Sequence, residues 1–343
     1  MLDRMTRIRG ALFGTAYGDA FAAPTEFLNI AQIRENWPPC GPMDLEGDPA
    51  RVTDDTQMAL AVGAALSRCP RETLGEDLAG FEHRLRRRFV EWANSPENDR
   101  APGRTCMAAC AELERGLPWY RATQDDSKGC GANMRVQPVG LLRLADWSAA
   151  DPRRGRLAQF QAALTHGHPT ALAASDLTAF ALAWLARAEG PLDGLLPALR
   201  EYAVGRRCKS PESWLEPLAR EGWRRPASKA MTLGWDECIG VLEALDRALR
   251  APDRQTDPCE QTGAAWIAEE AFATGLLCFL LFPDEPVAAL RRAAGTSGDS
   301  DSIACLTGAF VGAHRGFEAW PSAWESQIEY RMELNTLSLE LAK

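Results

Sequence analysis

Apolar residues recur at three- and four-residue spacing along almost the whole of this 343-residue chain. Such spacing is typical of amphipathic and buried α-helices. Neither the alternating pattern of strands nor an Asn-Gly hairpin turn accompanies it. The chain is therefore expected to adopt an all-α fold of many helices. The runs that carry the spacing are residues 6–20, 54–68, 75–93, 104–115, 156–165, 170–188, 192–205, 235–250, 265–281, 285–294 and 302–315.

The irregular stretches between these runs do not have the composition of flexible linkers. Residues 120–137, 206–232 and 251–263 are rich in aromatic residues and arginine rather than in glycine and serine. Apolar residues make up 46% of the chain, which supplies ample material for a core. We therefore expect one domain over residues 1–343.

The chain ends and the cysteines favour a cytoplasmic protein with reduced thiols. No run reaches the 18 or more apolar residues of a membrane span. The N-terminus is basic and then apolar, as in a signal peptide, but Asp19 interrupts it and its spacing is helical. Ten cysteines are scattered without a CxxC motif, so they are expected to pack in the core rather than to bind zinc.

The charge balance excludes one class of partner. Lysine and arginine number 38 against 47 aspartate and glutamate residues, which gives a net charge of −9. A net acidic chain without a basic block is a poor general binder of nucleic acid or of anionic membranes. Any anionic ligand must therefore be held locally, by a few donors, a helix N-terminus or a metal ion.

Two helical runs carry glycines at four-residue spacing. They are Gly10, Gly14 and Gly18 near the start, and Gly308, Gly312 and Gly316 near the end. Each glycine inside a helix costs about 1 kcal/mol relative to alanine. Three of them on one face indicate close packing against another backbone, so we interpret both runs as scaffold.

Two acidic clusters precede helical runs. Residues 53–56 read Thr-Asp-Asp-Thr, and residues 299–302 read Asp-Ser-Asp-Ser. Such residues are preferred helix N-caps, so two separate caps explain the clusters. Four carboxylates meeting in one place would instead repel one another unless cations lay between them. Carboxylate and hydroxyl oxygens suit Mg²⁺, Mn²⁺ or Ca²⁺. The pattern leaves both interpretations open.

Segments along nearly the whole chain, from about residue 6 to 325, closely resemble the ADP-ribosylglycohydrolase family. That family includes the dinitrogenase-reductase-activating glycohydrolase and the ADP-ribosyl-acceptor hydrolases. The matching segments, in order, are Gly10-xxx-Gly14-xxx-Gly18-Asp19-Ala20, Pro24-x-Glu26-Phe27, Thr53-Asp54-Asp55-Thr56, residues 127–136 (SKGCGANMRV), Leu164-Thr165-His166, residues 263–271 (GAAWIAEEA), residues 298–302 (GDSDS) and residues 308–313 (GAFVGA).

The resemblance implies a compact, orthogonal multi-helix fold with two Mg²⁺ or Mn²⁺ ions in a central cleft. Glu26 matches the family's glutamate near the metals, which gates the cleft or assists catalysis. Asp55 and Asp299 are implied as metal-bound aspartates that share the catalytic proton transfer. The full set of metal ligands implied by the resemblance is Thr53, Asp54, Asp55, Asp299, Asp301 and Ser302.

The same resemblance implies a substrate loop. Ser127, Gly129, Cys130 and Gly131 would bind the diphosphate, and His166 would lie near the ribose. Backbone N–H groups of a Gly-x-Gly turn can hold a pyrophosphate, as an acidic chain requires. On their own, these glycines are typical of any turn, and a lone histidine is typical of a core or a helix cap.

This chain departs from the family pattern at three places. Ser297 precedes Gly298, where the family often has a second glycine, and serines rather than threonine stand at 300 and 302. Serine keeps a hydroxyl ligand, so metal binding is expected to survive. Arginine-specific members carry an aspartate where this chain has Ala101, so the resemblance does not indicate an arginine linkage. Arginine, serine, a nucleic acid end and O-acetyl-ADP-ribose all stay open as acceptors.

The implied activity is metal-dependent hydrolysis of the ribosyl glycosidic bond, which releases ADP-ribose from a modified protein side chain or a related conjugate. Cleavage of such a bond passes through an oxocarbenium-like state. Two other functions remain open. One is a non-catalytic relative that binds ADP-ribose or serves structurally. The other is a dinuclear-metal phosphohydrolase that acts on ADP-ribose itself.

Overall fold

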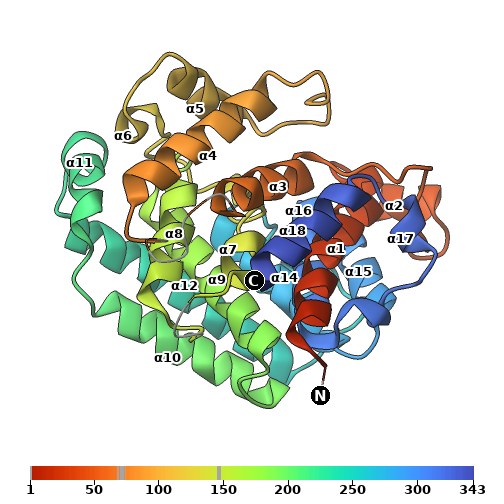
Figure 1. Ribbon diagram of the computed structural model, residues 1–343. Helices are drawn as coiled ribbons and strands as arrows, with labels where there is room; N and C mark the ends of the chain where they lie inside the picture. The colour runs from red at the N-terminus through yellow and green to blue at the C-terminus, as the bar shows by residue number, and fades with distance from the viewer. Residues whose placement is uncertain (1, 68, 70–72, 74, 145–147) are drawn as a thin grey trace.

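A computed structural model describes residues 2–67, 69, 73, 75–144 and 148–343 (Figure 1). These residues form helices and connecting loops, without a β-strand. Within them, β-type pairing is confined to three isolated bridges, Ala50–Ile328, Gln124–His166 and Gly129–Ile267. The all-α prediction is confirmed.

The helices vary widely in length. The longer ones are α1 (Arg4–Ala22), α3 (Asp54–Ser67), α4 (Leu78–Ala93), α5 (Arg104–Glu114), α8 (Pro152–Ala163), α9 (Pro169–Arg187), α10 (Leu195–Arg207), α12 (Ala227–Arg250), α14 (Ala268–Leu281), α15 (Pro286–Ala294), α16 (Ser300–Arg315) and α18 (Arg331–Ala342). The short ones are α2 (Ile30–Asn36), α6 (Trp119–Ala122), α7 (Gln137–Leu141), α11 (Glu216–Leu218), α13 (Cys259–Thr262) and α17 (Trp324–Gln327).

Local sequence signals fix several helix starts. Asp3 caps α1 by accepting a hydrogen bond from the Thr6 N–H, and Asn29 forms a reciprocal capping box with Gln32 at α2. Pro152 and Pro286 occupy the first positions of α8 and α15. A proline there costs nothing because the first N–H of a helix has no intrahelical partner.

Several parts of the chain are more helical than expected, and they include the short helices α6, α7, α13 and α17. The stretch 206–232 was expected to be irregular, but it contains α11 and the start of α12 at Ala227. Helices α2 and α18 were not predicted at all. In α18, Leu334, Leu337 and Leu341 are buried at three- and four-residue spacing, so the helical signal was present in the sequence.

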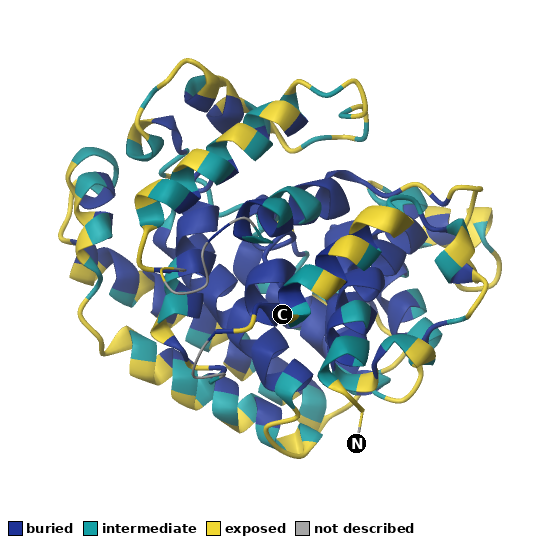
Figure 2. Cartoon of the chain, viewed as in Figure 1, coloured by how far each residue is buried: buried dark blue, intermediate teal, exposed yellow. Residues whose placement is uncertain are grey.

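Helices α1 and α16 form the most extensive helix pair in the described part of the chain. Glycines let the two backbones touch: a Cβ built on Gly14 would lie 2.1 Å from the Gly308 carbonyl oxygen. One built on Gly312 would lie 1.9 Å from the Gly10 oxygen. The predicted scaffold role of both glycine runs is therefore explained by a single contact. Figure 2 shows the buried residues gathered in these and the other central helices.

Helix α9 is long and apolar enough to cross a membrane by length and composition alone, which the sequence analysis did not anticipate. All of its apolar window is buried inside the protein, where it packs against α8, α12 and α14. This burial identifies α9 as a core helix of the fold.

Candidate metal centre and active site

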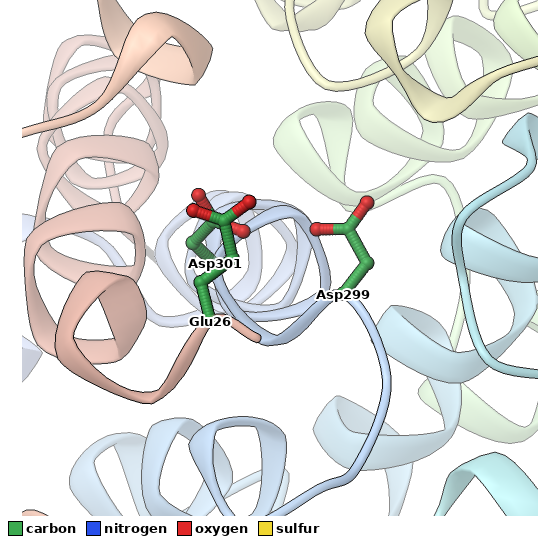
Figure 3. Close-up of side chains that lie close together, drawn as sticks. All are labelled: Glu26, Asp299 and Asp301. Carbon is green, nitrogen blue, oxygen red and sulfur yellow. The ribbon is translucent and has the colours of Figure 1, made fainter. Parts of the chain in front are cut away.

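Three carboxylates from the two ends of the chain meet beside the α1–α16 pair (Figure 3). Glu26 follows the turn that ends α1, Asp299 precedes α16, and Asp301 lies in the first turn of α16. One oxygen from each carboxylate lies within 4.8 Å of the others. The close contact of α1 with α16 therefore brings acids that are more than 270 positions apart into one cluster.

The first turn of α3 adds Asp54 and Asp55 to the same cleft. A buried carboxylate, Asp19 of α1, holds this turn in place. It accepts hydrogen bonds from the Thr53 N–H at 2.9 Å, the Thr56 N–H at 3.0 Å and the Thr56 hydroxyl at 2.5 Å. Asp19 thus fixes the backbone that presents Asp54 and Asp55, which is a positioning role that the sequence analysis did not assign.

The cleft has a volume of about 400 Å³, within the range of small-molecule sites. Ten of the twelve site residues implied by the resemblance line it: Glu26, Asp54, Asp55, Gly129, Cys130, Gly131, His166, Asp299, Asp301 and Ser302. Two do not. The Thr53 hydroxyl accepts a hydrogen bond from the Asp55 N–H at 3.3 Å, and the Ser127 hydroxyl lies 3.1 Å from that of Thr105, which does line the cleft.

The loop with the two glycines lies directly on His166. A Cβ on Gly131 would be 2.8 Å from the His166 ring, so glycine is required there by close packing. The Cys130 N–H is bonded to the Trp266 carbonyl at 3.1 Å, and its thiol donates to Asp299 at 2.8 Å. Cys130 therefore contributes its side chain to the acidic cluster, and its own N–H already has a partner.

Burial dominates the electrostatics of the cluster. Burial first, and then the charges of Asp299 and Asp54, raise the pKa of Glu26 to about 8. Burial likewise raises the pKa of Asp54 to about 7. For Asp55 and Asp301, burial and the neighbouring carboxylates raise the pKa well above the ordinary range. His166 is neutral, because burial, reinforced by the Arg135 charge, holds its pKa well below 6.5.

The donor set fits divalent cations. Among the described residues, none of the five acids in the cleft forms an ion pair. The Oδ2 atom of Asp55 is buried without a hydrogen-bond partner, although such atoms normally have one. Asp299 occupies the N-cap position of α16, yet its side chain makes no capping hydrogen bond. Hard cations between the carboxylates would satisfy these oxygens.

Two aromatic side chains that line the cleft were not predicted as site residues from the sequence. Phe27 and Trp266 are 65% and 43% exposed, and their rings stack with centroids 5.9 Å apart. Phe27 has a φ of 65°, an uncommon conformation for a non-glycine residue. Both residues lie in segments that match the family, but nothing in the sequence indicates that these two segments touch.

The cleft lining contains the third departure from the family pattern. Ala101 lines the cleft at the position where arginine-specific members carry an acid. The adjoining Gly103 N–H donates to Asp54 at 3.3 Å, so this loop lies directly beside the acidic cluster. Arg104, at the start of α5, is exposed and lines the same wall.

The raised pKa values make the stability of the metal-free protein depend on pH. The folded state holds protons on Asp54 and Glu26 up to about pH 7 and 8, whereas the unfolded chain releases them near pH 4. Stability in EDTA is therefore expected to fall as pH rises between these values. Thermal unfolding in EDTA at pH 5 and pH 8 checks this.

Added Mn²⁺ should raise the temperature midpoint of unfolding more at pH 8 than at pH 5, because cations compete with protons for the carboxylate ligands. A larger rise at pH 5 would contradict the prediction.

Comparisons with known proteins identify the family of the chain. The family model of ADP-ribosylglycohydrolase matches residues 1–343. The ADP-ribosyl-[dinitrogen reductase] glycohydrolase of Rhodospirillum rubrum is 25% identical, with 95% of this chain and 92% of that protein covered. The ADP-ribosylarginine hydrolase Tri1 of Serratia proteamaculans is 24% identical, with 99% and 80% covered. Human ADP-ribosylhydrolase ARH3 is 25% identical, with 98% and 93% covered.

The fold has a solved counterpart. An ADP-ribosylglycohydrolase-related protein complex contains a chain with a TM-score of 0.64 and 23% sequence identity, over 98% of this chain and 97% of that chain. At this identity the likeness concerns the fold. The family match, in contrast, spans every motif from Gly10 to Gly312. The chain belongs to the ADP-ribosylglycohydrolase family.

Proposed function

We propose that this protein is a divalent-metal-dependent hydrolase that removes ADP-ribose from a modified acceptor by cleaving the ribosyl glycosidic bond. The observation that carries the proposal is the meeting of Glu26, Asp299 and Asp301 in the cleft that Asp54 and Asp55 also line. So many carboxylates without a basic partner destabilise the protein, as buried charges do. A need for metal ions and substrate accounts for them.

The proposed metal ligands are Asp54, Asp55, Asp299 and Asp301, with the hydroxyls of Ser302 and Thr53 beside them. Two Mg²⁺ or Mn²⁺ ions held there would polarise bound oxygen atoms and lower the pKa of water. Asp19 keeps the α3 turn rigid, and the Cys130 thiol holds one oxygen of Asp299. These contacts orient the carboxylates before substrate arrives, which reduces the cost of binding.

Glu26 is the residue proposed to move a proton. Its carboxyl group lies beside Asp301 and has a pKa raised to about 8. A group of this kind exchanges protons near neutral pH, where a catalytic acid or base is most effective. Glu26 would protonate the departing acceptor or accept a proton from the attacking water. The neutral His166 ring supports the glycine loop, which is proposed to hold the diphosphate of the substrate.

The related proteins named above act on different conjugates, so the acceptor must be determined by experiment. In this chain Ala101 leaves the cleft wall without the acid that would pair with a guanidinium group, and Arg104 adds a positive charge there. Both features disfavour a cationic acceptor side chain. We therefore propose an acceptor other than arginine, from a protein or another ADP-ribosyl conjugate.

The test is a panel of ADP-ribosylated substrates, with the release of free ADP-ribose as the measured product. Activity is expected to fall to background in EDTA and to return with Mg²⁺ or Mn²⁺, because the carboxylates cannot orient substrate without cations. Full activity in EDTA would refute the metal requirement. Release of AMP and ribose phosphate would identify a phosphohydrolase. Calorimetry showing bound ADP-ribose without turnover on any linkage would identify a non-catalytic relative.

A further inference from the structure

A second pocket, separate from the cleft, lies between α2, α15 and the loop after α12. Helices α2 and α15 are both on the right of Figure 1. The pocket has a volume of about 430 Å³ and shares no lining residue with the cleft. Four arginines line it, and no aspartate or glutamate does: Arg34, Arg254, Arg291 and Arg292.

In the part of the chain that the structure describes, many arginines pair with an acid, as Arg100 does with Glu329 and Arg206 with Asp176, but those of this pocket do not. Within the described residues, none of the four forms an ion pair. Asp284, just before α15, pairs instead with Arg315 at 2.6 Å. A protein with nine more acids than bases has carboxylates to spare. Their exclusion from this pocket leaves four like charges to repel one another.

The contacts that the arginines do make leave donors free. Arg291 donates one N–H to the Cys40 sulfur at 2.8 Å, a weak acceptor. Arg292 is only 9% exposed and donates to the backbone carbonyl of Thr256. The Nε atoms of both Arg291 and Arg292 are buried without a partner. Arg254 lies over the Phe282 ring, 4.7 Å from its centroid.

We propose that this pocket binds the phosphoryl groups of a nucleotide-sized ligand. Guanidinium groups bind phosphate oxygens through paired, charge-assisted hydrogen bonds, and the buried Arg292 supplies a fixed one. The volume suits a mononucleotide, and Phe282 with Ile30 offers an apolar surface for its base. An anion here offsets the repulsion among the four arginines.

The pocket adjoins the segments that carry the acidic cluster. Helix α2 begins four residues after Glu26, and its first N–H, that of Ile30, donates to the Ser297 hydroxyl at 3.1 Å. Gly295 lines the pocket, four residues before Asp299. A ligand in this pocket is therefore held beside the cleft, and its binding does not depend on the proposed hydrolase activity.

Calorimetry with ADP as the probe tests the proposal on the full chain in EDTA, where no divalent cation assists binding in the cleft. The double variant R254Q/R291Q is compared with R115Q/R250Q, which removes the same charge from exposed positions outside the pocket. ADP is expected to bind the wild type and the control alike, and R254Q/R291Q at least about tenfold more weakly, since each lost charged hydrogen bond costs about that much.

Two outcomes would overturn the proposal. Equal ADP affinity in wild type and R254Q/R291Q would place the nucleotide elsewhere. Equal affinity of wild type for ADP and for adenosine would show that phosphoryl groups are not what is recognised. If the double variant fails to fold, R254Q alone serves, because Arg254 is exposed and stacks only on Phe282 among the contacts described. The absence of hydrolase activity would leave all of these results unchanged.

Discussion

Asp55→Asn is expected to lower the turnover of ADP-ribosyl substrate by on the order of 10²–10³ while making the metal-free protein more stable. A metal site supplies several kcal/mol of transition-state stabilisation, and each 1.4 kcal/mol is a factor of ten in rate. Asparagine has the same shape as aspartate but cannot carry the charge that a cation needs. Its amide also removes the penalty of burying a carboxylate whose pKa is raised well above its ordinary value.

The two effects are measured separately. Initial rates with Mg²⁺ give the loss of turnover, and thermal unfolding in EDTA gives the change in stability. The gain in stability is expected at pH 8 and to shrink as the pH falls toward and below about 4, where the carboxyl group becomes protonated in the unfolded state as well. Turnover within a few-fold of wild type would remove Asp55 from the site.

Asp19→Asn is the matched control. Asp19 is as deeply buried as Asp55, but it accepts hydrogen bonds from the backbone and hydroxyl groups of the α3 turn. An amide NH₂ facing these donors loses bonds, so this variant is expected to be less stable by about 1–3 kcal/mol. Asp19, whose carboxylate has hydrogen-bond partners, is expected to stabilise the fold, whereas Asp55, which has an oxygen without a partner, is expected to bind the cation. Equal changes in stability for the two variants would contradict this distinction.

Much of the helical structure could be predicted from the sequence, because the spacing of apolar residues is a local property of the chain. Three- and four-residue spacing places a helix wherever one face is buried, and it identified each of the longer helices except α18. Boundaries were less accurate, as at α12, which begins eight residues before the expected start at 235. Its first turns face solvent on one side, and Gly234 lies against the backbone of Pro169, a contact with a distant segment that periodicity does not register.

Residues of the candidate site could be selected from the sequence, but their role as metal ligands could not be decided from it. Residue type and spacing singled out Asp54, Asp55, Asp299 and Asp301, but the same residues are equally good helix caps. The decision between caps and a cation site depends on distance. Only the folded chain brings Glu26 within reach of Asp299 and Asp301, and leaves an oxygen of Asp55 without a partner.

Features that arise from contacts between distant segments could not be predicted from the sequence. The Phe27–Trp266 stack joins residues nearly 240 positions apart, and the arginine pocket joins α2 to α15. Arg34 and Arg291 are unremarkable in a chain that uses arginine for most of its basic residues. Their shared pocket is a property of the tertiary structure alone.

Gly308→Ala is expected to destabilise the protein by about 3 kcal/mol or more, at or above the usual range for overpacking. Its Cβ would lie 1.9 Å from the carbonyl oxygen of Gly14, and backbone cannot rotate away as a side chain can. Chemical denaturation checks the free energy of unfolding. Gly240→Ala in α12 is the control, because nothing lies within 4 Å of its Cβ. There, alanine should stabilise by about 0.5–1 kcal/mol through helix propensity.

The same substitution tests how the scaffold sets the site. Glu26 follows α1, and Asp299 and Asp301 open α16, so the spacing between these helices determines the spacing of the three carboxylates. Under conditions where the Gly308→Ala variant still folds, the added methyl group should push α1 and α16 apart and move the three carboxylates away from one another. Mn²⁺ is then expected to bind more weakly, which calorimetry measures. Gly240→Ala should leave Mn²⁺ affinity unchanged. Wild-type affinity in a destabilised Gly308→Ala protein would mean that the acids hold their positions without the helix contact.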